Sequence, residues 1–341
     1  MPGHPPQDRR RFLRAVAAAL AAGRLGVPGR AAAQAGAPPA APQAGWGPLK
    51  QVDAGQLRVA YAEAGPPGGP PVLLLHGWPY DIHGFADAAP LLAARGHRVI
   101  VPYLRGYGAT RFLSDAAPRN GQQAALAVDA VALLDALGIE RAVVGGFDWG
   151  ARTACIVAAL WPERCRALVS VSGYLIGSRE ANRMPLPPAA EYQWWYQYYF
   201  ATERGRLGYE KNLLDFNRLV WRLASPEWRF DDATYARTAA SFANPDHVAI
   251  VVHNYRWRLG LAEGDPRHDA LEQRLARFPT IGVPTITLEG DANGAPHPAP
   301  ASYAAKFTGR YEHRLVRGAG HALPQEAPRE FAQAILDVAT W

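Results

Sequence analysis

Short apolar runs alternate with helix-like segments along residues 57–172. Strands are predicted at 71–77, 97–106, 141–146 and 166–173, and an amphipathic helix that ends at a glycine is predicted at 121–138. Runs of this kind, apolar throughout and separated by helices, are typical of a parallel sheet that is covered on both faces. The pattern therefore predicts an α/β core.

The alternation stops at Tyr174 and returns near residue 283. The intervening chain is rich in Trp, Tyr and Arg and contains helix-like stretches. Further strands are predicted at 283–291 and 311–318, and a closing helix is predicted at 324–339. We therefore expect one core, residues 48–173 and 279–341, whose eight strands are mostly parallel. A helical lid, residues 174–278, is expected to be inserted after the sixth strand.

Residues 1–35 have a different composition. An arginine cluster is followed by an Ala- and Leu-rich run, and Ala33-Gln34-Ala35 offers an Ala-x-Ala cleavage site. This order is that of a secretory signal, and Arg9-Arg10 with the Phe-Leu pair that follows resembles the twin-arginine export motif. We expect export to the periplasm, with residues 36–47 as a flexible linker rich in Pro, Ala and Gly.

The leader also explains most of the charge. Its six arginines and one aspartate carry +5 of the formal net charge of +6, which leaves +1 for residues 36–341. Nucleic-acid binding is therefore not expected. No later apolar run is long enough to predict a membrane span, and Cys155 and Cys165 are predicted to be buried free thiols. The Cys and His spacing predicts no metal site, no cofactor is expected, and the oligomeric state is left open.

Asp148 is a charged residue at the end of an apolar run, in the sequence Gly-Phe-Asp-Trp-Gly. Small residues two positions before and after it permit the sharp strand-to-helix turn that raises a nucleophile above a sheet. Asp is also a common helix N-cap, but a cap does not require glycines on both sides. Ligands of parallel sheets bind beyond the carboxyl ends of the strands. We therefore predict that Asp148 is a nucleophile.

Two other loops carry complementary groups. Trp78 follows the strand at 71–77, where a backbone N–H is expected to form an oxyanion hole together with the N–H of Trp149, the residue after the nucleophile. His321 follows the last predicted strand, in the position of a general base.

The segments HGWP (76–79), VPYLRGYGAT (101–110), GGFDWGAR (145–152) and GAGHALPQEAP (318–328) together resemble one superfamily. This is the α/β-hydrolase superfamily, in the branch with an Asp nucleophile that contains epoxide hydrolases, haloalkane dehalogenases and haloacetate dehalogenases. The resemblance covers residues 48–341 and implies the α/β-hydrolase fold. It also implies that Asp148 attacks a saturated carbon and that His321 activates the water that hydrolyses the alkyl ester.

The resemblance to epoxide hydrolases also implies two lid tyrosines that protonate the opening oxygen. Tyr196 begins a Tyr-x-x-x-Phe pattern near the start of the lid, and Tyr255 precedes an arginine near its end. Tyr198 and Tyr199 are alternatives from the same aromatic stretch.

An acid that orients the base is implied after the seventh strand, as the Asp of Gly-x-x-Asp. Asn293 occupies that position here, and Asp291 lies two residues earlier. We predict Asp291 as the acid, with Asn293 as the alternative that orients His321. An Asn would stabilise an imidazolium poorly and would slow the hydrolysis of the ester.

The preferred interpretation is an epoxide hydrolase that converts an apolar or aromatic epoxide and water to a vicinal diol. The alternative is a haloalkane or haloacetate dehalogenase. Trp149 lies where haloalkane dehalogenases bind halide, and Arg152 matches one of two arginines that hold a carboxylate in haloacetate dehalogenases, whereas the second is Trp149 here. A catalytically weak protein that binds an apolar ligand is a third possibility, because Asn293 replaces the expected acid.

Overall fold

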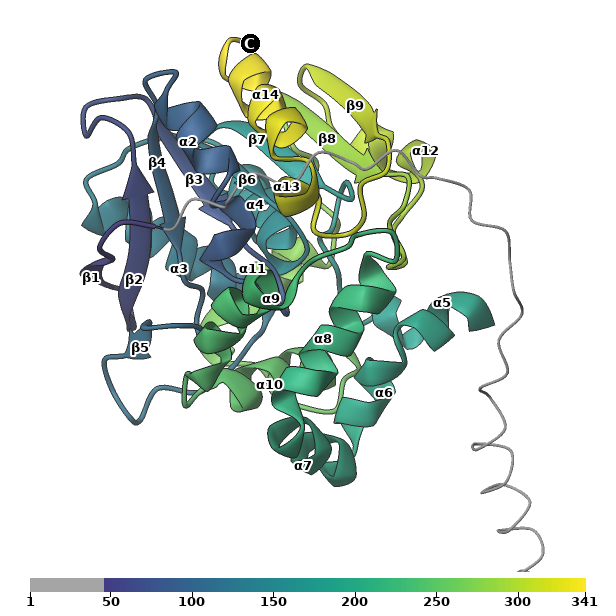
Figure 1. Cartoon of the computed structure of the whole chain (residues 1–341). Coiled ribbons are helices and arrows are strands. Elements are labelled where there is room, and N and C mark those ends of the chain that lie inside the picture. Colours follow the sequence, from purple (N-terminus) through teal and green to yellow (C-terminus); the bar gives the residue numbers. More distant parts are fainter. Residues whose placement is uncertain (1–45) are drawn as a thin grey trace, which may run out of the picture. The chain divides into compact units, whose positions relative to one another are not determined.

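The computed structural model describes residues 46–341 (Figure 1). The predicted signal segment, residues 1–35, and all but the last two residues of the predicted linker, residues 36–47, lie outside the described part. The assignments of both segments stay predictions. None of the helices within residues 46–341 combines the length and the apolar character needed to cross a membrane.

One sheet forms the centre of the core, with its main path in the order β1-β2-β4-β3-β6-β7-β8-β9 and the short β5 paired to β2. The strands are β1 Lys50–Ala54, β2 Leu57–Ala64, β3 Pro71–Leu75, β4 Arg98–Pro102, β5 Arg111–Phe112, β6 Ala142–Gly146, β7 Cys165–Val171, β8 Thr285–Gly290 and β9 Tyr311–Val316. All pairs from β4 to β9 along this path are parallel, and β1 and β2 are antiparallel to their neighbours. The predicted mostly parallel sheet is confirmed, with eight strands on its main path and β5 in addition.

Helices cover both faces of this sheet. Those packed on the strands are α2 Ala88–Ala93, α3 Gln123–Ala136, α4 Trp149–Leu160 and α14 Pro328–Ala339. Successive residues of a strand face opposite sides of the sheet. A Cβ placed on Gly145 would meet Phe331 and Ile335 of α14, whereas one on Gly146 would meet Gly150 of α4. Helices α14 and α4 therefore lie on opposite faces.

The closing helix is shorter than predicted. The segment at 324–339 was expected to be one helix, but α13 Leu323–Glu326 ends before Pro328 and α14 begins at that proline. Proline lacks an N–H and restricts the residue before it, which favours a helix start at this position. Cys155 and Cys165 are buried and unpaired, as predicted.

Seven helices fall within the predicted lid. They are α5 Pro188–Gln193, α6 Trp195–Ala201, α7 Glu203–Lys211, α8 Leu213–Ala224, α9 Asp232–Ala239, α10 His247–Arg258 and α11 Asp269–Leu275. Figure 1 shows α6, α7, α8 and α10 gathered on one side of the core. They follow β7, which is the sixth strand on the main path, and the chain rejoins the sheet at β8.

Candidate active site

Asp148 lies in a strained turn between β6 and α4. Its backbone has φ 52° and ψ −121°, a region that residues with a side chain rarely adopt. A Cβ on Gly146 would lie 2.5 Å from the carbonyl carbon of Gly150, and a Cβ on Gly150 would lie 1.8 Å from the carbonyl oxygen of Leu75. Both glycines are therefore required for the turn, as their spacing predicts. Asp148 makes no capping hydrogen bond to α4, so the helix-cap interpretation is not supported.

The Asp148 carboxylate is held from two sides. The Trp78 N–H donates to Oδ1 at 2.8 Å, and Nε2 of His321 lies 3.4 Å from Oδ2. The loop of Trp78 can approach this closely because Gly77 has no side chain. A Cβ on Gly77 would lie only 2.3 Å from the Cβ of Asp148. Of the two predicted oxyanion-hole donors, the Trp78 N–H contacts the Asp148 carboxylate, and its role as such a donor stays a prediction. The second, the N–H of Trp149, stays a prediction.

The charges of Asp148 and His321 stabilise each other. Burial alone raises the pKa of Asp148, but the hydrogen bond and positive charge of His321, with Arg152 and the Trp78 N–H, outweigh it and hold the pKa below its usual value. Burial lowers the pKa of His321, but Asp148, followed by Glu289 and Glu326, raises it above its usual value. The charge of each group thus favours the ionised form of the other, imidazolium for His321 and carboxylate for Asp148.

The loop that carries His321 is fixed by a partly buried carboxylate. Glu326 accepts from the N–H of Gly320 at 2.7 Å and from the N–H of Ala322 at 3.0 Å, and Ser225 of the lid donates to it at 2.6 Å. The His321 N–H donates to the same Ser225 hydroxyl at 2.9 Å. The backbone on both sides of His321 is thereby fixed, while Nδ1 of its ring is buried without a hydrogen-bond partner among the described residues.

The predicted acid does not reach His321. Asp291 is exposed and accepts from the Gly318 N–H at 2.6 Å, because its side chain turns outward from the end of β8 toward the loop that follows β9. Asn293 makes no hydrogen bond to the His321 ring either; its amide donates to Glu289 at 2.9 Å. This corrects the prediction that Asp291 orients His321, and it applies equally to the Asn293 alternative.

Glu289 is the carboxylate that the sequence analysis missed. It is the penultimate residue of β8 and only 5% exposed, and its Oε1 accepts the Asn293 amide at 2.9 Å. Its charge contributes to the raised pKa of His321. The available signal was the single charged residue of the strand-like segment TITLEG, since carboxylates are rarely buried without a partner.

The two predicted lid tyrosines lie side by side near Asp148. The rings of Tyr196 and Tyr255 have their centres 5.2 Å apart, and each also packs on Trp78, at 4.9 Å and 5.2 Å respectively. Burial and the negative charge of Asp148 raise the pKa of Tyr196, and burial, the Tyr196 ring and Asp148 raise that of Tyr255. Both phenols are therefore protonated at neutral pH and can donate.

The alternative tyrosines are less well placed. The Tyr199 hydroxyl lies against Gly208 and its ring stacks on Phe216, within the lid itself. Tyr198 is 47% exposed, and its hydroxyl donates to Glu191.

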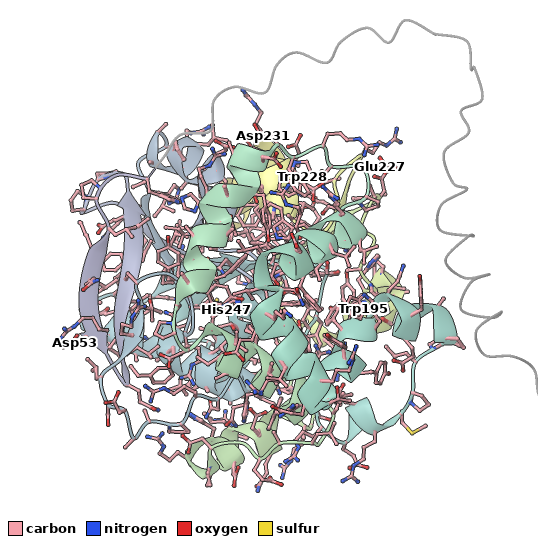
Figure 2. The ribbon with its side chains drawn as sticks, turned by 60° about the horizontal axis from the view of Figure 1, so that its bottom comes forward. Asp53, Trp195, Glu227, Trp228, Asp231 and His247 are labelled. Carbon is pink, nitrogen blue, oxygen red and sulfur yellow. The ribbon has the colours of Figure 1, made fainter. Side chains whose placement is uncertain are left out.

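A buried hydrogen-bond chain fixes Trp78 beneath the lid. The Trp78 indole donates to the Tyr209 hydroxyl at 2.9 Å, and this hydroxyl lies 3.0 Å from Nε2 of His247, the α10 residue labelled in Figure 2. Nδ1 of His247 lies 3.0 Å from the Gly106 carbonyl oxygen, and burial lowers the pKa of His247 to about 4. The neutral ring therefore donates to Gly106 and accepts from Tyr209, which fixes the direction of the chain.

The carboxylate, the histidine and the two lid tyrosines described above face one cavity of about 1180 Å³, which is lined by the core and the lid. Its lining includes Asp148, His321, Tyr196 and Tyr255 and, from two different helices, Arg152 and Arg258. The arrangement brings together a carboxylate, a base that can be generated from His321, and two proton donors. It is suited to nucleophilic attack followed by hydrolysis.

Comparison with known proteins agrees with this geometry. Residues 70–324 match the α/β-hydrolase fold family. The chain is 36% identical over 150 residues to epoxide hydrolase B of Mycobacterium tuberculosis, an alignment that spans 40% of this chain and 41% of that protein. It is 27% identical over 319 residues to epoxide hydrolase A of the same organism, which spans 85% and 96% of the two chains.

A solved structure is similar over most of the chain. It is a Klebsiella pneumoniae protein, provisionally described as an epoxide hydrolase, with 60% identity, a TM-score of 0.85 and coverage of 86% of this chain and 97% of that one. The family match covers residues on both sides of the lid and contains Asp148 and His321. The chain belongs to the α/β-hydrolase fold family.

Proposed function

We propose that the protein is an epoxide hydrolase that converts an epoxide to a vicinal diol through an ester on Asp148. The observation that carries the proposal is the position of Tyr196 and Tyr255 in the same cavity as Asp148. An epoxide oxygen leaves the attacked carbon as an alkoxide and needs a proton, which a halide does not. Two protonated phenols facing a carboxylate supply that proton.

In the first step, Oδ2 of Asp148 attacks an epoxide carbon while Trp78 holds Oδ1. The ring C–O bond breaks, and the alkoxide takes a proton from Tyr196 or Tyr255. The ester carries no negative charge, so the largest influence that raises the pKa of His321 disappears. His321 then loses its proton to solvent, and the tyrosine regains one.

In the second step, neutral His321 removes a proton from water as the water attacks the carbonyl carbon of the ester. Oδ1 becomes the oxyanion, and the Trp78 N–H already donates to that oxygen. Collapse of the intermediate releases the diol and regenerates the Asp148 carboxylate. Glu289 and Glu326 are the negative charges that remain to stabilise the imidazolium formed in this step.

A dehalogenase is the second candidate, and one observation favours it. The indole Nε1 of Trp149 is buried beside Tyr255, and an indole N–H at this position can donate to a halide. A panel of epoxides, haloalkanes and haloacetates separates the two functions. Diol release from epoxides supports our proposal, whereas halide release without any diol would overturn it.

Replacing Tyr196 or Tyr255 alone with phenylalanine is expected to slow formation of the alkyl-enzyme about 10- to 100-fold. The double variant is expected to slow it about 10³-fold or more, because the alkoxide then lacks both proton donors. Rapid-quench measurement of epoxide consumption in a single turnover checks this. Tyr199→Phe is the matched control, since its hydroxyl lies against Gly208 within the lid. A double variant with the wild-type rate would contradict the assignment.

Replacing Glu289 with glutamine is expected to slow ester hydrolysis about 10- to 100-fold, because one pKa unit of the imidazolium corresponds to about a factor of ten. The charge of Glu289 raises the pKa of His321. Its removal lowers that pKa, so the acid limb of the kcat profile moves to lower pH while the plateau falls. Glutamine keeps an oxygen for the Asn293 amide.

The control for Glu289→Gln is Asp291→Asn, which changes the exposed carboxylate bonded to Gly318. We expect its kcat and pH profile to stay within about twofold of wild type. A large loss in Asp291→Asn with none in Glu289→Gln would restore the prediction made from the sequence.

A further inference from the structure

Two arginines on different helices line the same cavity as Asp148 and the two tyrosines. Arg152 is four residues after Asp148 on α4, and Arg258 is three residues after Tyr255 on α10. Residues three or four apart lie on the same face of a helix. Each arginine therefore lies one helical turn beyond a residue of the proposed reaction, and both line the cavity together with those residues.

Neither guanidinium is neutralised by a carboxylate within residues 46–341. Arg152 donates from Nε to the Leu175 carbonyl oxygen at 3.0 Å and makes no ion pair. Arg258 also makes no ion pair, and its guanidinium lies over the rings of Trp194 and Tyr255, at 5.5 Å and 5.7 Å. Other arginines of the lid, such as Arg256 and Arg267, do have acidic partners.

The two positive charges repel each other. Burial and then the charge of Arg258 lower the pKa of Arg152 to about 10, so Arg152 stays charged at neutral pH. Two neighbouring cations that make no ion pair are costly to hold together, and an anion that enters between them removes part of that cost. Asp148 offsets part of the charge of Arg152, but its two oxygens contact Trp78 and His321 and it makes no ion pair with either arginine.

The outer part of the cavity has the opposite character. Met184, Leu186, Leu219 and Leu223 all line it, and each is more than 40% exposed. Large apolar side chains that stay exposed around a cavity are typical of a site that binds an apolar ligand. The cavity is thus cationic close to Asp148 and apolar toward its rim.

On the basis of the proposed function, we propose that the substrate is an epoxide with a carboxylate next to the ring and an apolar or aromatic tail. Arg152 and Arg258 hold the carboxylate, which places the epoxide carbon in front of Asp148 and the ring oxygen near Tyr196 and Tyr255. The tail extends along Leu219 and Leu223. The carboxylate takes no part in bond making or breaking; it orients the ring.

The test compares two substrates of the same shape and different charge. The full chain is assayed with trans-3-phenylglycidate and with its neutral primary amide, and kcat/KM is measured for each. Wild type is expected to prefer the carboxylate. In Arg258→Gln the ratio of the two kcat/KM values is expected to fall about 10- to 100-fold, mainly through KM, as for the loss of a charge-assisted hydrogen bond. Arg258→Lys should recover part of the ratio.

Arg222→Gln is the matched control, because it removes the same charge from an exposed position of the lid outside the cavity. Its ratio is expected to equal that of wild type. If Arg258→Gln slows both substrates equally, the arginine supports the tyrosines or the fold rather than a carboxylate, and the proposal is overturned. A wild-type enzyme without preference overturns it as well.

A binding measurement separates this proposal from the proposed function. Titration calorimetry with 3-phenylpropionate and 3-phenylpropionamide requires no turnover. Tighter binding of the carboxylate that is lost in Arg258→Gln supports the anion site even if no epoxide is hydrolysed. Equal affinity for both compounds contradicts the anion site even if epoxides are hydrolysed.

Discussion

Asp148→Asn is expected to reduce kcat/KM for epoxides by about 10⁴-fold or more, because an amide cannot attack the epoxide carbon as a carboxylate does. Asparagine has nearly the same shape and tolerates positive φ better than most residues, so the strained turn at φ 52° is retained. Diol formation measured by chromatography, beside the thermal transition of the same sample, checks the expectation. A folded variant with more than a few per cent of wild-type activity would exclude Asp148 as the nucleophile.

The same variant tests the coupling between Asp148 and His321. Asp148 raises the pKa of His321, so the histidine in Asp148→Asn is expected to titrate at lower pH than in wild type. Resolved imidazole signals in an NMR titration measure this directly. An unchanged His321 pKa would mean that the 3.4 Å approach of the two side chains carries no electrostatic coupling.

The unfolding free energy is expected to depend on pH through the same interaction between Asp148 and His321. The lowered pKa of Asp148 stabilises the fold above the unfolded value of about 3.9, and this contribution is lost as pH falls through the folded pKa. The raised pKa of His321 stabilises the fold below the unfolded value of about 6.5, and this contribution is lost as pH rises through the folded pKa. The difference in unfolding free energy between wild type and Asp148→Asn is therefore expected to be largest between about pH 4 and 6.5.

His321→Gln is expected to reduce kcat by about 10³-fold or more while one equivalent of epoxide is still consumed. Attack by Asp148 does not require a base, but hydrolysis of the ester does, so the alkyl-enzyme accumulates. Intact mass spectrometry should show the added mass of the epoxide, and peptide mapping should place it on Asp148.

The matched control for His321→Gln is His297→Gln. His297 lines the same cavity and lies 3.8 Å from Glu289, but it has no step in the proposed mechanism. We expect no alkyl-enzyme to accumulate in this variant. Accumulation in both variants, or in neither, would contradict the role of His321 as the base.

The sharp turn at Asp148 could be predicted because its cause is local. Gly146 and Gly150 are required by contacts with backbone atoms within or beside the turn, and such contacts follow directly from the spacing of small residues. The strands of the core could also be predicted from the sequence, because buried parallel strands are apolar throughout.

The choice between Glu289 and Asp291 as the acid near His321 could not be made from the sequence, because it depends on which way side chains point at the end of one strand. Asp291 and Glu289 are two residues apart, yet Asp291 turns toward Gly318 and Glu289 stays buried beside Asn293. The turn after β8 decides between them, and no residue pattern fixes the geometry of that turn.

The paired arginines are a matter of packing between distant segments. Arg152 and Arg258 are separated by most of the lid in sequence, and they share a cavity only because α10 places Tyr255 against Trp78 and Trp149 of the core. In the sequence only Arg152 matches the two-arginine pattern, because Trp149 stands at the second position. The lid supplies the second one from a helix whose orientation depends on the folded core.

The most direct test of the ester on Asp148 is a single turnover in ¹⁸O-labelled water with enzyme in excess over epoxide. If the ester forms and water attacks its carbonyl carbon, the first diol carries no label and ¹⁸O appears in the Asp148 carboxylate. If water attacks the epoxide directly, the diol carries the label and Asp148 does not, which would contradict the mechanism.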